Sequence, residues 1–245
     1  MSSDVIQAAA WGFVAASALP LGALVAMSTT LSTRTVGAIM AFGAGTLISA
    51  VTFELVEQAF ARADLWPVVA GLGLGAVAFT AGDAALVRAG ARRHRKGGGD
   101  ADGDGGLVIA LGAVLDGVPE SLVLGILLAS GGAISTTFLI AVFISNLPES
   151  LASTRGMLDA GYPRARVLML WTVVAVVSGV VAAVGATLDG LDQAVVALVQ
   201  SFAAGALLAL IADSLLPEAY RDTGLRTGLF VVLGFALAFG LTAFD

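Results

Sequence analysis

The tetrapeptide Pro-Glu-Ser-Leu occurs at residues 119–122 and again at residues 148–151. Each copy lies inside an apolar stretch long enough to cross a bilayer, and each places a proline beside a carboxylate there. A proline inside a helix removes one backbone hydrogen bond and clashes with the carbonyl group four residues earlier. A carboxylate in hydrocarbon is costly unless a partner compensates for it. Two such sites predict a pair of kinked helices that share a cation inside the membrane.

The composition is typical of a membrane protein. Of the 245 residues, 58% are apolar and 12% are charged, whereas about 25% of the residues in soluble domains are charged. We therefore expect one transmembrane domain over residues 1–245, surrounded by a lipid bilayer and with no nucleic acid as partner. The absence of cysteine excludes disulfides and thiolate metal sites. The first residues carry no basic cluster of the kind that begins a cleaved signal peptide.

Eight apolar stretches are long enough to be transmembrane helices, each of which needs about 20 mostly apolar residues. Short polar or acidic breaks separate them, for example at 28–33, 130–132 and 159–166. The pattern predicts an all-α membrane protein with eight transmembrane helices, at roughly 8–28, 35–60, 65–89, 106–129, 133–158, 165–187, 193–216 and 224–243.

Basic residues predict the orientation, because cytoplasmic loops are enriched in Lys and Arg. With both termini outside, the inner loops hold eleven of the 12 basic residues and the outer loops hold only Arg62. We therefore expect the N-terminus and the C-terminus both to lie outside. The longest loop, 91–106, is basic, then Gly-rich, then acidic, and we expect it to be disordered and cytoplasmic. Its histidine, His94, is expected to be solvated rather than to collect metal.

Two internal similarities suggest a repeat. The Pro-Glu-Ser-Leu motif occurs in the fourth and in the fifth predicted span, and the stretch 42–60 resembles the stretch 202–220 when Phe42 is aligned with Phe202. The expected topology runs the two members of each pair in opposite directions. The sequence therefore predicts three helices, a central pair and three more helices, a 3+2+3 inverted repeat of the kind that places a transport site near the membrane midplane.

Acidic residues inside the predicted spans are candidates for function, because intramembrane ionisable groups are functional by default. Asp116 and Glu120 are four residues apart, so they share one helix face. Asn146 and Glu149 are three residues apart and also share a face, with Ser145 one step round the helix. We expect these five residues to bind metal through oxygen atoms, which suit Mn²⁺ or Mg²⁺, whereas Zn²⁺ more often takes nitrogen or sulfur. The alternative is that they only bond backbone or water at a structural kink.

Three further acids are candidates for a pathway that relays the metal toward the cytoplasm. Glu54, Glu57 and Asp213 lie nearer the predicted ends of their spans, where simple solvation is the alternative role. Glu218 and Asp83 are expected at the interface. No Lys or Arg lies deep in a predicted span, so the sequence offers these acids no obvious cationic partner within the chain.

The residues now on the page resemble those of the ZIP family of divalent metal transporters, and the chain is similar to a divergent prokaryotic member. The family's fourth-span motif, His-Asn-x-Pro-Glu-Gly, is matched by Asp-Gly-Val-Pro-Glu-Ser at 116–121. The fifth-span motif, His-(Asn/Asp/Glu)-x-Pro-Glu-Gly, is matched by Ser-Asn-Leu-Pro-Glu-Ser at 145–150. The seventh span keeps Leu-Pro-Glu-Ala at 216–219. The resemblance extends over almost the whole chain.

The departures from the family pattern bear on the metal. Both motif histidines are replaced, by Asp116 and Ser145, and Gly117 stands where the family has the asparagine that supports a second metal. Ala182 occupies the place of a sixth-span glutamate. The resemblance therefore implies one metal, held by Asp116, Glu120, Asn146 and Glu149 with Ser145, and a selectivity that extends beyond Zn²⁺ to Mn²⁺ or Fe²⁺.

The resemblance implies uptake of a divalent transition metal through the cell membrane into the cytoplasm by alternating access, with the metal as substrate, no cofactor and no enzymatic activity. An arriving metal would displace protons from Glu120 and Glu149. Three alternatives remain open: a non-transporting metal sensor, a proton-linked carrier of another solute, and an intramembrane hydrolase with paired aspartates. The oligomeric state also remains open, with a homodimer as one arrangement.

Overall fold

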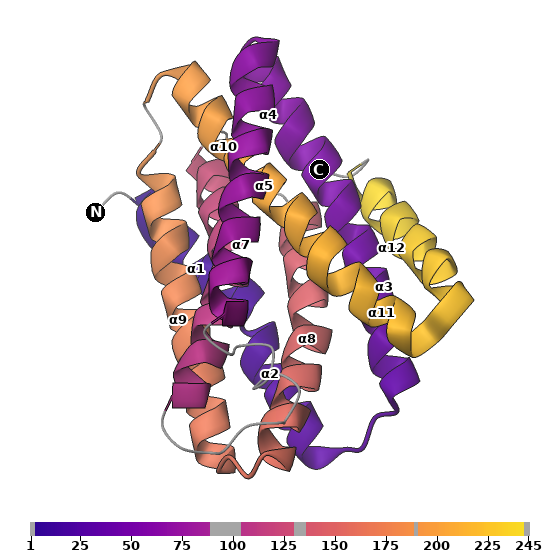
Figure 1. The fold of residues 1–245 in the computed structure, drawn as a ribbon. Helices are drawn as coiled ribbons and strands as arrows, with labels where there is room; N and C mark the ends of the chain where they lie inside the picture. The colour runs from indigo at the N-terminus through magenta and orange to yellow at the C-terminus, as the bar shows by residue number, and fades with distance from the viewer. Residues whose placement is uncertain (1–2, 89–103, 130–135, 189–190, 243–245) are drawn as a thin grey trace.

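A computed structural model describes residues 3–88, 104–129, 136–188 and 191–242, and within these ranges the chain is helical with no β-strand. The helices lie side by side in one bundle (Figure 1). They follow the predicted apolar segments. Their bounds are α1 Ser3–Ala16, α2 Ala18–Ser28, α3 Thr33–Ala50, η1 Val51–Val56, α4 Glu57–Arg62, α5 Leu65–Arg88, α7 Asp104–Ala129, α8 Thr136–Asp159, α9 Arg164–Ala186, α10 Gln193–Leu210, η2 Ile211–Leu215, α11 Leu216–Thr223, η3 Gly224–Arg226 and α12 Thr227–Leu241.

Among the described residues, five helical stretches are long and apolar enough to cross a membrane. They are Ser3–Ser28, Thr33–Arg62, Leu65–Arg88, Arg164–Ala186 and Gln193–Leu241. The last of these is 49 residues long and contains the predicted seventh span and all but the last two residues of the predicted eighth. Helices α7 and α8 occupy the predicted fourth and fifth spans. The expectation of an all-helical membrane protein is therefore confirmed.

The first predicted span is divided into two helices. Helix α1 ends at Ala16 and α2 begins at Ala18, with Ser17 between them. Pro20 has no N–H, so the carbonyl of Ala16 loses its regular helical donor. The Ser17 hydroxyl donates to the carbonyl of Val14 at 2.6 Å, which closes the end of α1. The sequence analysis missed this break because the flanking residues are apolar on both sides.

The prolines of the two Pro-Glu-Ser-Leu motifs do not end their helices. Pro119 lies inside α7 and Pro148 lies inside α8, and each helix continues for more than two turns past its proline. Most of the predicted 91–106 linker, including His94, lies outside the described residues, and its last three residues already belong to α7. The motif glutamates therefore project from continuous helices.

The helices pack as two groups. The first, called here the α7–α8 group, contains α1, α2, α7, α8 and α9, in which α9 packs on α1 and α7 while α2 packs on α8. The second, the α3–α10 group, contains the remaining helices, in which α5 packs on α10, and α12 packs on α3. Contacts of α3 with α8 and of α10 with α7 join the groups. The two motif helices therefore lie at the boundary between the groups.

Two short π-helical segments interrupt the α3–α10 group. Segment η1 covers Val51–Val56 and η2 covers Ile211–Leu215, and their first residues fall opposite each other when Phe42 is aligned with Phe202. Each contains one acid, Glu54 in η1 and Asp213 in η2. π-helical segments are rare in proteins, and those that do occur often lie at functional sites. Figure 1 shows α3 and α10, the helices that lead into them, running in opposite directions.

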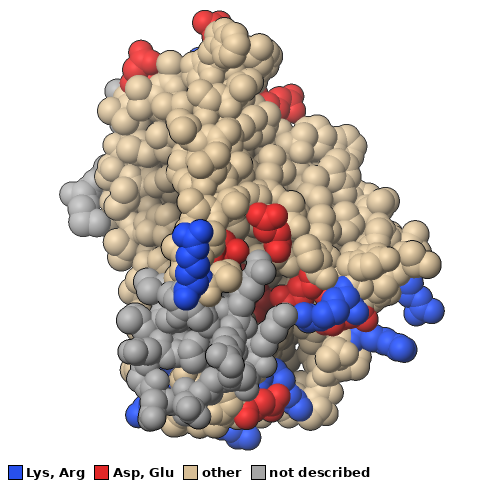
Figure 2. Space-filling view, viewed as in Figure 1, with Lys and Arg blue, Asp and Glu red and all other residues tan. Residues whose placement is uncertain are grey.

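Charged side chains are unevenly distributed over the surface. In Figure 2 most of the visible basic side chains lie in the lower half of the molecule, whereas acidic side chains are visible at the top, near the middle and at the bottom. The lower end of the bundle in Figure 1 carries the connection from α2 to α3 and the one from α8 to α9. These are among the connections that the sequence predicts to be cytoplasmic.

Candidate metal-transport site

Helix α7 buries its two motif acids. Asp116 is 6% exposed and Glu120 is 4% exposed. Their spacing of four residues places them on one side of the helix, as the sequence predicts. Burial of an ionised carboxylate is unfavourable unless the carboxylate is paired or bound to a cation.

Helix α8 supplies the facing polar groups. Ser145 and Asn146 are both buried, and Glu149 is half-buried. The Asn146 Nδ2 donates to Glu120 Oε2 at 3.4 Å, a long hydrogen bond that joins α8 to α7. The Ser145 hydroxyl donates to the carbonyl of Val142 at 2.9 Å, which leaves its oxygen lone pairs for another donor or a cation.

A second buried hydrogen bond joins α8 to α9. The Trp171 Nε1 on α9 donates to Thr154 Oγ1 on α8 at 2.8 Å, and the two side chains are 1% and 0% exposed. A buried tryptophan N–H normally finds an acceptor, and here that acceptor follows shortly after the Pro-Glu-Ser-Leu motif of α8. This bond limits rotation of α8 about its axis and so helps to set the direction of Asn146 and Glu149.

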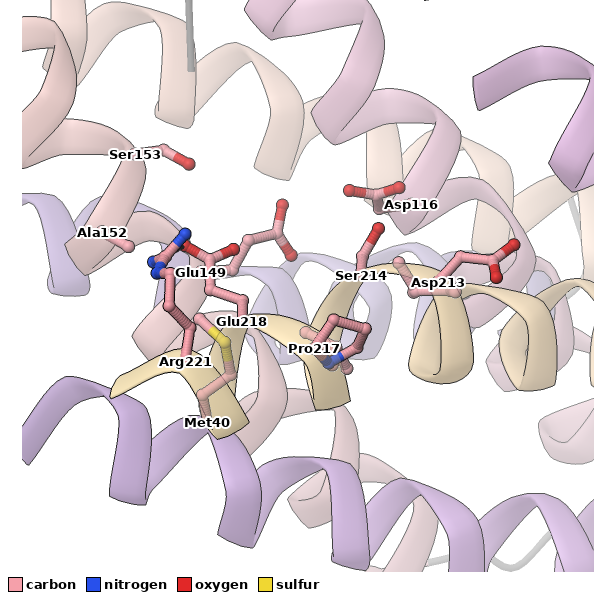
Figure 3. Close-up of a pocket in the computed structure, with 12 residues that line it drawn as sticks. Met40, Asp116, Glu149, Ala152, Ser153, Asp213, Ser214, Pro217, Glu218 and Arg221 are labelled. Carbon is pink, nitrogen blue, oxygen red and sulfur yellow. Dashed lines mark hydrogen bonds and ion pairs between the residues drawn. The ribbon is translucent and has the colours of Figure 1, made fainter. Parts of the chain in front are cut away.

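A cavity of about 260 Å³ reaches the two motif helices from one end of the bundle. Asp116 and Glu149 line it on the side of α7 and α8, and η2 and α11 form the facing wall (Figure 3). The lining also includes Met40, Ser153, Asp213, Ser214, Glu218 and Arg221. Arg221 lies with Glu218 toward one end of this lining and Asp213 lies toward the other (Figure 3). Glu120 lies outside the lining, although the charges of Glu149 and Asp116 both act on it.

The predicted ligands are neighbours without forming a finished metal site. Among the described residues, no three His, Cys, Asp or Glu side chains converge closely enough to hold one ion. Instead, Asp116 and Glu149 place two carboxylates at the cavity. The carboxylate of Glu120, which accepts a hydrogen bond from Asn146, lies outside the cavity lining. Chemically, this is a cluster of hard oxygen donors, which suits divalent cations.

The three predicted pathway acids differ in position. Asp213 lines the cavity. Glu54 is 7% exposed, and its Oε2 accepts a hydrogen bond from Gln58 Nε2 at 3.0 Å. Glu57 is exposed and is not among the residues that line the described cavity. The structure therefore brings only one of the three to the cavity of Asp116 and Glu149.

The sequence analysis missed several residues of the cavity. Ser153 follows Glu149 by four residues, so the same helix-face argument could have found it. Ser214 is next to Asp213 in the π-helical segment η2, and no local sequence pattern predicted that segment. The sequence analysis used Arg221 only to predict the orientation of the chain. In the structure Arg221 lines the cavity and forms salt bridges with Glu218 at 3.3 Å and with Asp222 at 3.0 Å. The expectation that these acids lack a cationic partner is therefore wrong for Glu218.

Comparison with known proteins identifies the family of the chain. The family model described as ZIP zinc transporter matches residues 91–242, which is more than half of the chain and includes both Pro-Glu-Ser-Leu motifs. No curated protein matches the chain. Taken with the apolar helices, this match shows that the chain is a membrane protein of the ZIP zinc transporter family, whose members transport divalent metal cations and are not enzymes.

Proposed function

We propose that this protein carries divalent transition-metal cations across the cell membrane into the cytoplasm, through a site formed by Asp116, Glu120, Asn146 and Glu149 with Ser145. The observation that carries the proposal is the hydrogen bond from Asn146 to Glu120, which joins the two motif helices beside the cavity that Asp116 and Glu149 line. The substrates that fit are Zn²⁺, Mn²⁺ and Fe²⁺. Carboxylate and amide oxygens favour the harder ions of this set.

The proposed topology has eight spans with both termini outside. It is supported by the distribution of basic residues, because Arg155, Arg164 and Arg221 lie at ends of helices that the topology places in the cytoplasm. The cavity is lined at α11 by Glu218 and Arg221, which belong to the same end. On this topology the structure is open toward the cytoplasm, and a metal at Asp116 and Glu149 would leave in that direction.

The proposed inverted repeat is supported by matching contacts. A side chain at Gly45 of α3 would collide with the carbonyl of Val231 on α12, and one at Gly205 of α10 would collide with the carbonyl of Leu72 on α5. These two glycines occupy the same position in the alignment of 42–60 with 202–220. The reverse contacts also match, because Gly234 meets the carbonyl of Phe42 while Gly75 meets that of Phe202. The α3–α12 crossing therefore corresponds to the α10–α5 crossing.

The proposed mechanism follows from the two helix groups. A metal entering from outside displaces protons from Glu120 and Glu149 and binds between α7 and α8. The α7–α8 group then shifts against the α3–α10 group, which moves the site from one opening to the other. Asp213 receives the metal on the cytoplasmic side, because it lines the cavity into which the site opens.

The test compares metal uptake by cells with the metal content of purified protein. Glu120→Gln and Glu149→Gln remove one charge each at nearly constant shape, so each is expected to lower uptake about tenfold or more and to reduce bound metal. Asp159→Asn is the matched control, because Asp159 is an exposed acid at the end of α8. Unchanged uptake in both glutamate variants would refute the site. Metal bound by the native protein without any uptake would favour a sensor.

A further inference from the structure

Helices α2 and α8 cross within the second Pro-Glu-Ser-Leu motif. Ser150, which directly follows Glu149 in α8, is 0% exposed. A Cβ atom at Gly22 of α2 would collide with the Ser150 Oγ and would come within 2.8 Å of the carbonyl oxygen of Leu147. Gly22 therefore leaves the space that the Ser150 side chain occupies. The two helices approach each other at the turn of α8 that carries Pro148 and Glu149.

The Ser150 hydroxyl connects this turn to its surroundings. It donates to the carbonyl of Leu147 at 3.0 Å, and the carbonyl oxygen of Ala18 on α2 lies 3.5 Å from the same Oγ. A serine that donates to the preceding turn of its own helix often bends that helix. Pro148 removes a backbone hydrogen bond from the same stretch of α8. The position of the Ser150 side chain therefore affects the course of α8 next to Glu149.

Helix α3 approaches the same stretch of α8 across the boundary between the two helix groups. A Cβ atom at Gly43 of α3 would come within 3.0 Å of the Ser145 Cα and within 3.3 Å of the carbonyl oxygen of Ile144. Of the two approaches to the motif, the closer one is therefore made by α2, which belongs to the same group as α8. We expect α2 and α8 to keep this contact when the groups shift.

We propose that Gly22 and Ser150 form a size-matched pair that positions Glu149 in the metal site, with Ser150 as a positioning residue rather than a ligand. The Ser150 hydroxyl faces its own helix and α2, and Ser150 does not line the cavity of Asp116 and Glu149. This inference rests on the proposed function, because it concerns the ligand Glu149. Groups that orient a metal ligand typically account for about 10–100-fold in metal affinity. A change in the spacing of α2 and α8 therefore weakens metal binding although neither residue of the pair contacts the metal.

The test measures the affinity of the purified protein for Mn²⁺ by titration, together with the midpoint of thermal unfolding. Gly22→Ala adds one methyl group at the crossing and is expected to lower the affinity about tenfold. Ser150→Gly removes one hydrogen bond and is expected to lower it about threefold. The double variant lacks the Oγ that the new methyl group would meet, so it is expected to bind Mn²⁺ more tightly than Gly22→Ala does. Recovery is partial, because the contact with the carbonyl of Leu147 remains.

The matched control is Gly179→Ala on α9, in the same helix group. A Cβ atom there would come within 2.8 Å of the carbonyl oxygen of Ala9 on α1, which is the distance that Gly22 shows to Leu147. Gly179→Ala is expected to lower the midpoint of unfolding and to leave the affinity for Mn²⁺ unchanged. An equal loss of affinity in this control would overturn the proposal, because it would reflect general destabilisation.

The double variant and a smaller change decide the remaining outcomes. Losses of affinity that simply add in the double variant would show that the two residues act independently, and would overturn the pairing. If Gly22→Ala does not fold, Ser150→Ala carries the test, because it removes only the hydroxyl oxygen. Weaker Mn²⁺ binding by Ser150→Ala supports the positioning role, and native affinity overturns it.

Binding of Mn²⁺ by Glu149→Gln separates this inference from the proposed function. If Glu149→Gln loses affinity while Gly22→Ala and Ser150→Ala bind Mn²⁺ as the native protein does, the metal site stands and the positioning pair is wrong. If Glu149→Gln binds Mn²⁺ with native affinity, the proposed site is wrong, and with it the positioning of Glu149 in that site.

Discussion

At the scale of single residues, the motif glutamates depend on the polar neighbours that the second motif provides. Glu120 is buried beside two further carboxylates, and Asn146 donates a hydrogen bond to it from the facing helix. The sequence could predict that these residues share faces of their helices, because the spacing within each motif is local. It could not predict which face of α7 meets which face of α8, since that depends on packing against α9 and α3.

We predict that Asn146→Leu weakens metal binding more than Ser145→Ala does. The leucine leaves Glu120 without its amide donor and removes one oxygen ligand, and loss of a group that orients a ligand typically costs about 10–100-fold in metal affinity. Ser145 already donates to its own helix, so its removal loses only one weak ligand. Titration of purified protein with Mn²⁺ and Zn²⁺ measures both effects. Equal affinities for the native protein and Asn146→Leu would show that the amide is not part of the site.

At the scale of helices, close crossings at glycine hold the α3–α10 group together. Packing between helices in a membrane relies on small residues that let backbones approach. The sequence showed that 42–60 resembles 202–220, but it could not show that Gly45 and Gly205 make corresponding contacts with different helices. The division of the first span at Ser17 and the bond between Arg62 and Gln200 were also beyond sequence reasoning. The first depends on how an apolar segment tolerates Pro20, and the second joins residues 138 positions apart.

We predict that Gly45→Ala and Gly205→Ala destabilise the protein to similar degrees. Each added methyl group would collide with a carbonyl of the partner helix, and overpacking of this kind typically costs about 1–3 kcal/mol. The control is Gly73→Ala on α5, where the new methyl group meets nothing within 4 Å. Thermal unfolding in detergent, followed by circular dichroism, should show lowered midpoints for the first two variants and no lowering for the control. A native midpoint for Gly45→Ala would contradict the close α3–α12 crossing.

At the scale of the whole molecule, the distribution of charge and the position of the cavity support the proposed direction of transport. Basic side chains gather toward one end, and the cavity of Asp116 and Glu149 is lined by residues of the same end. The composition and the spacing of apolar segments were enough to predict a helical membrane protein, because both reflect the thickness and chemistry of the bilayer. The division into two groups was not predictable in detail, since the long helices are apolar on most of their surface and the contacts between them are set by shape.

We predict that the end of the bundle bearing Leu31 and Asp159 faces the cytoplasm. Leu31 and Asp159 are exposed near helix ends on that side, whereas Asp64 is exposed at the connection between α4 and α5. Asp64→Cys should therefore react with an impermeant thiol reagent added to intact cells. Leu31→Cys and Asp159→Cys should react only after permeabilisation. The reverse pattern would place the cavity on the outer side, so that the structure would be open toward the source of the metal and Asp213 would act at entry rather than at release.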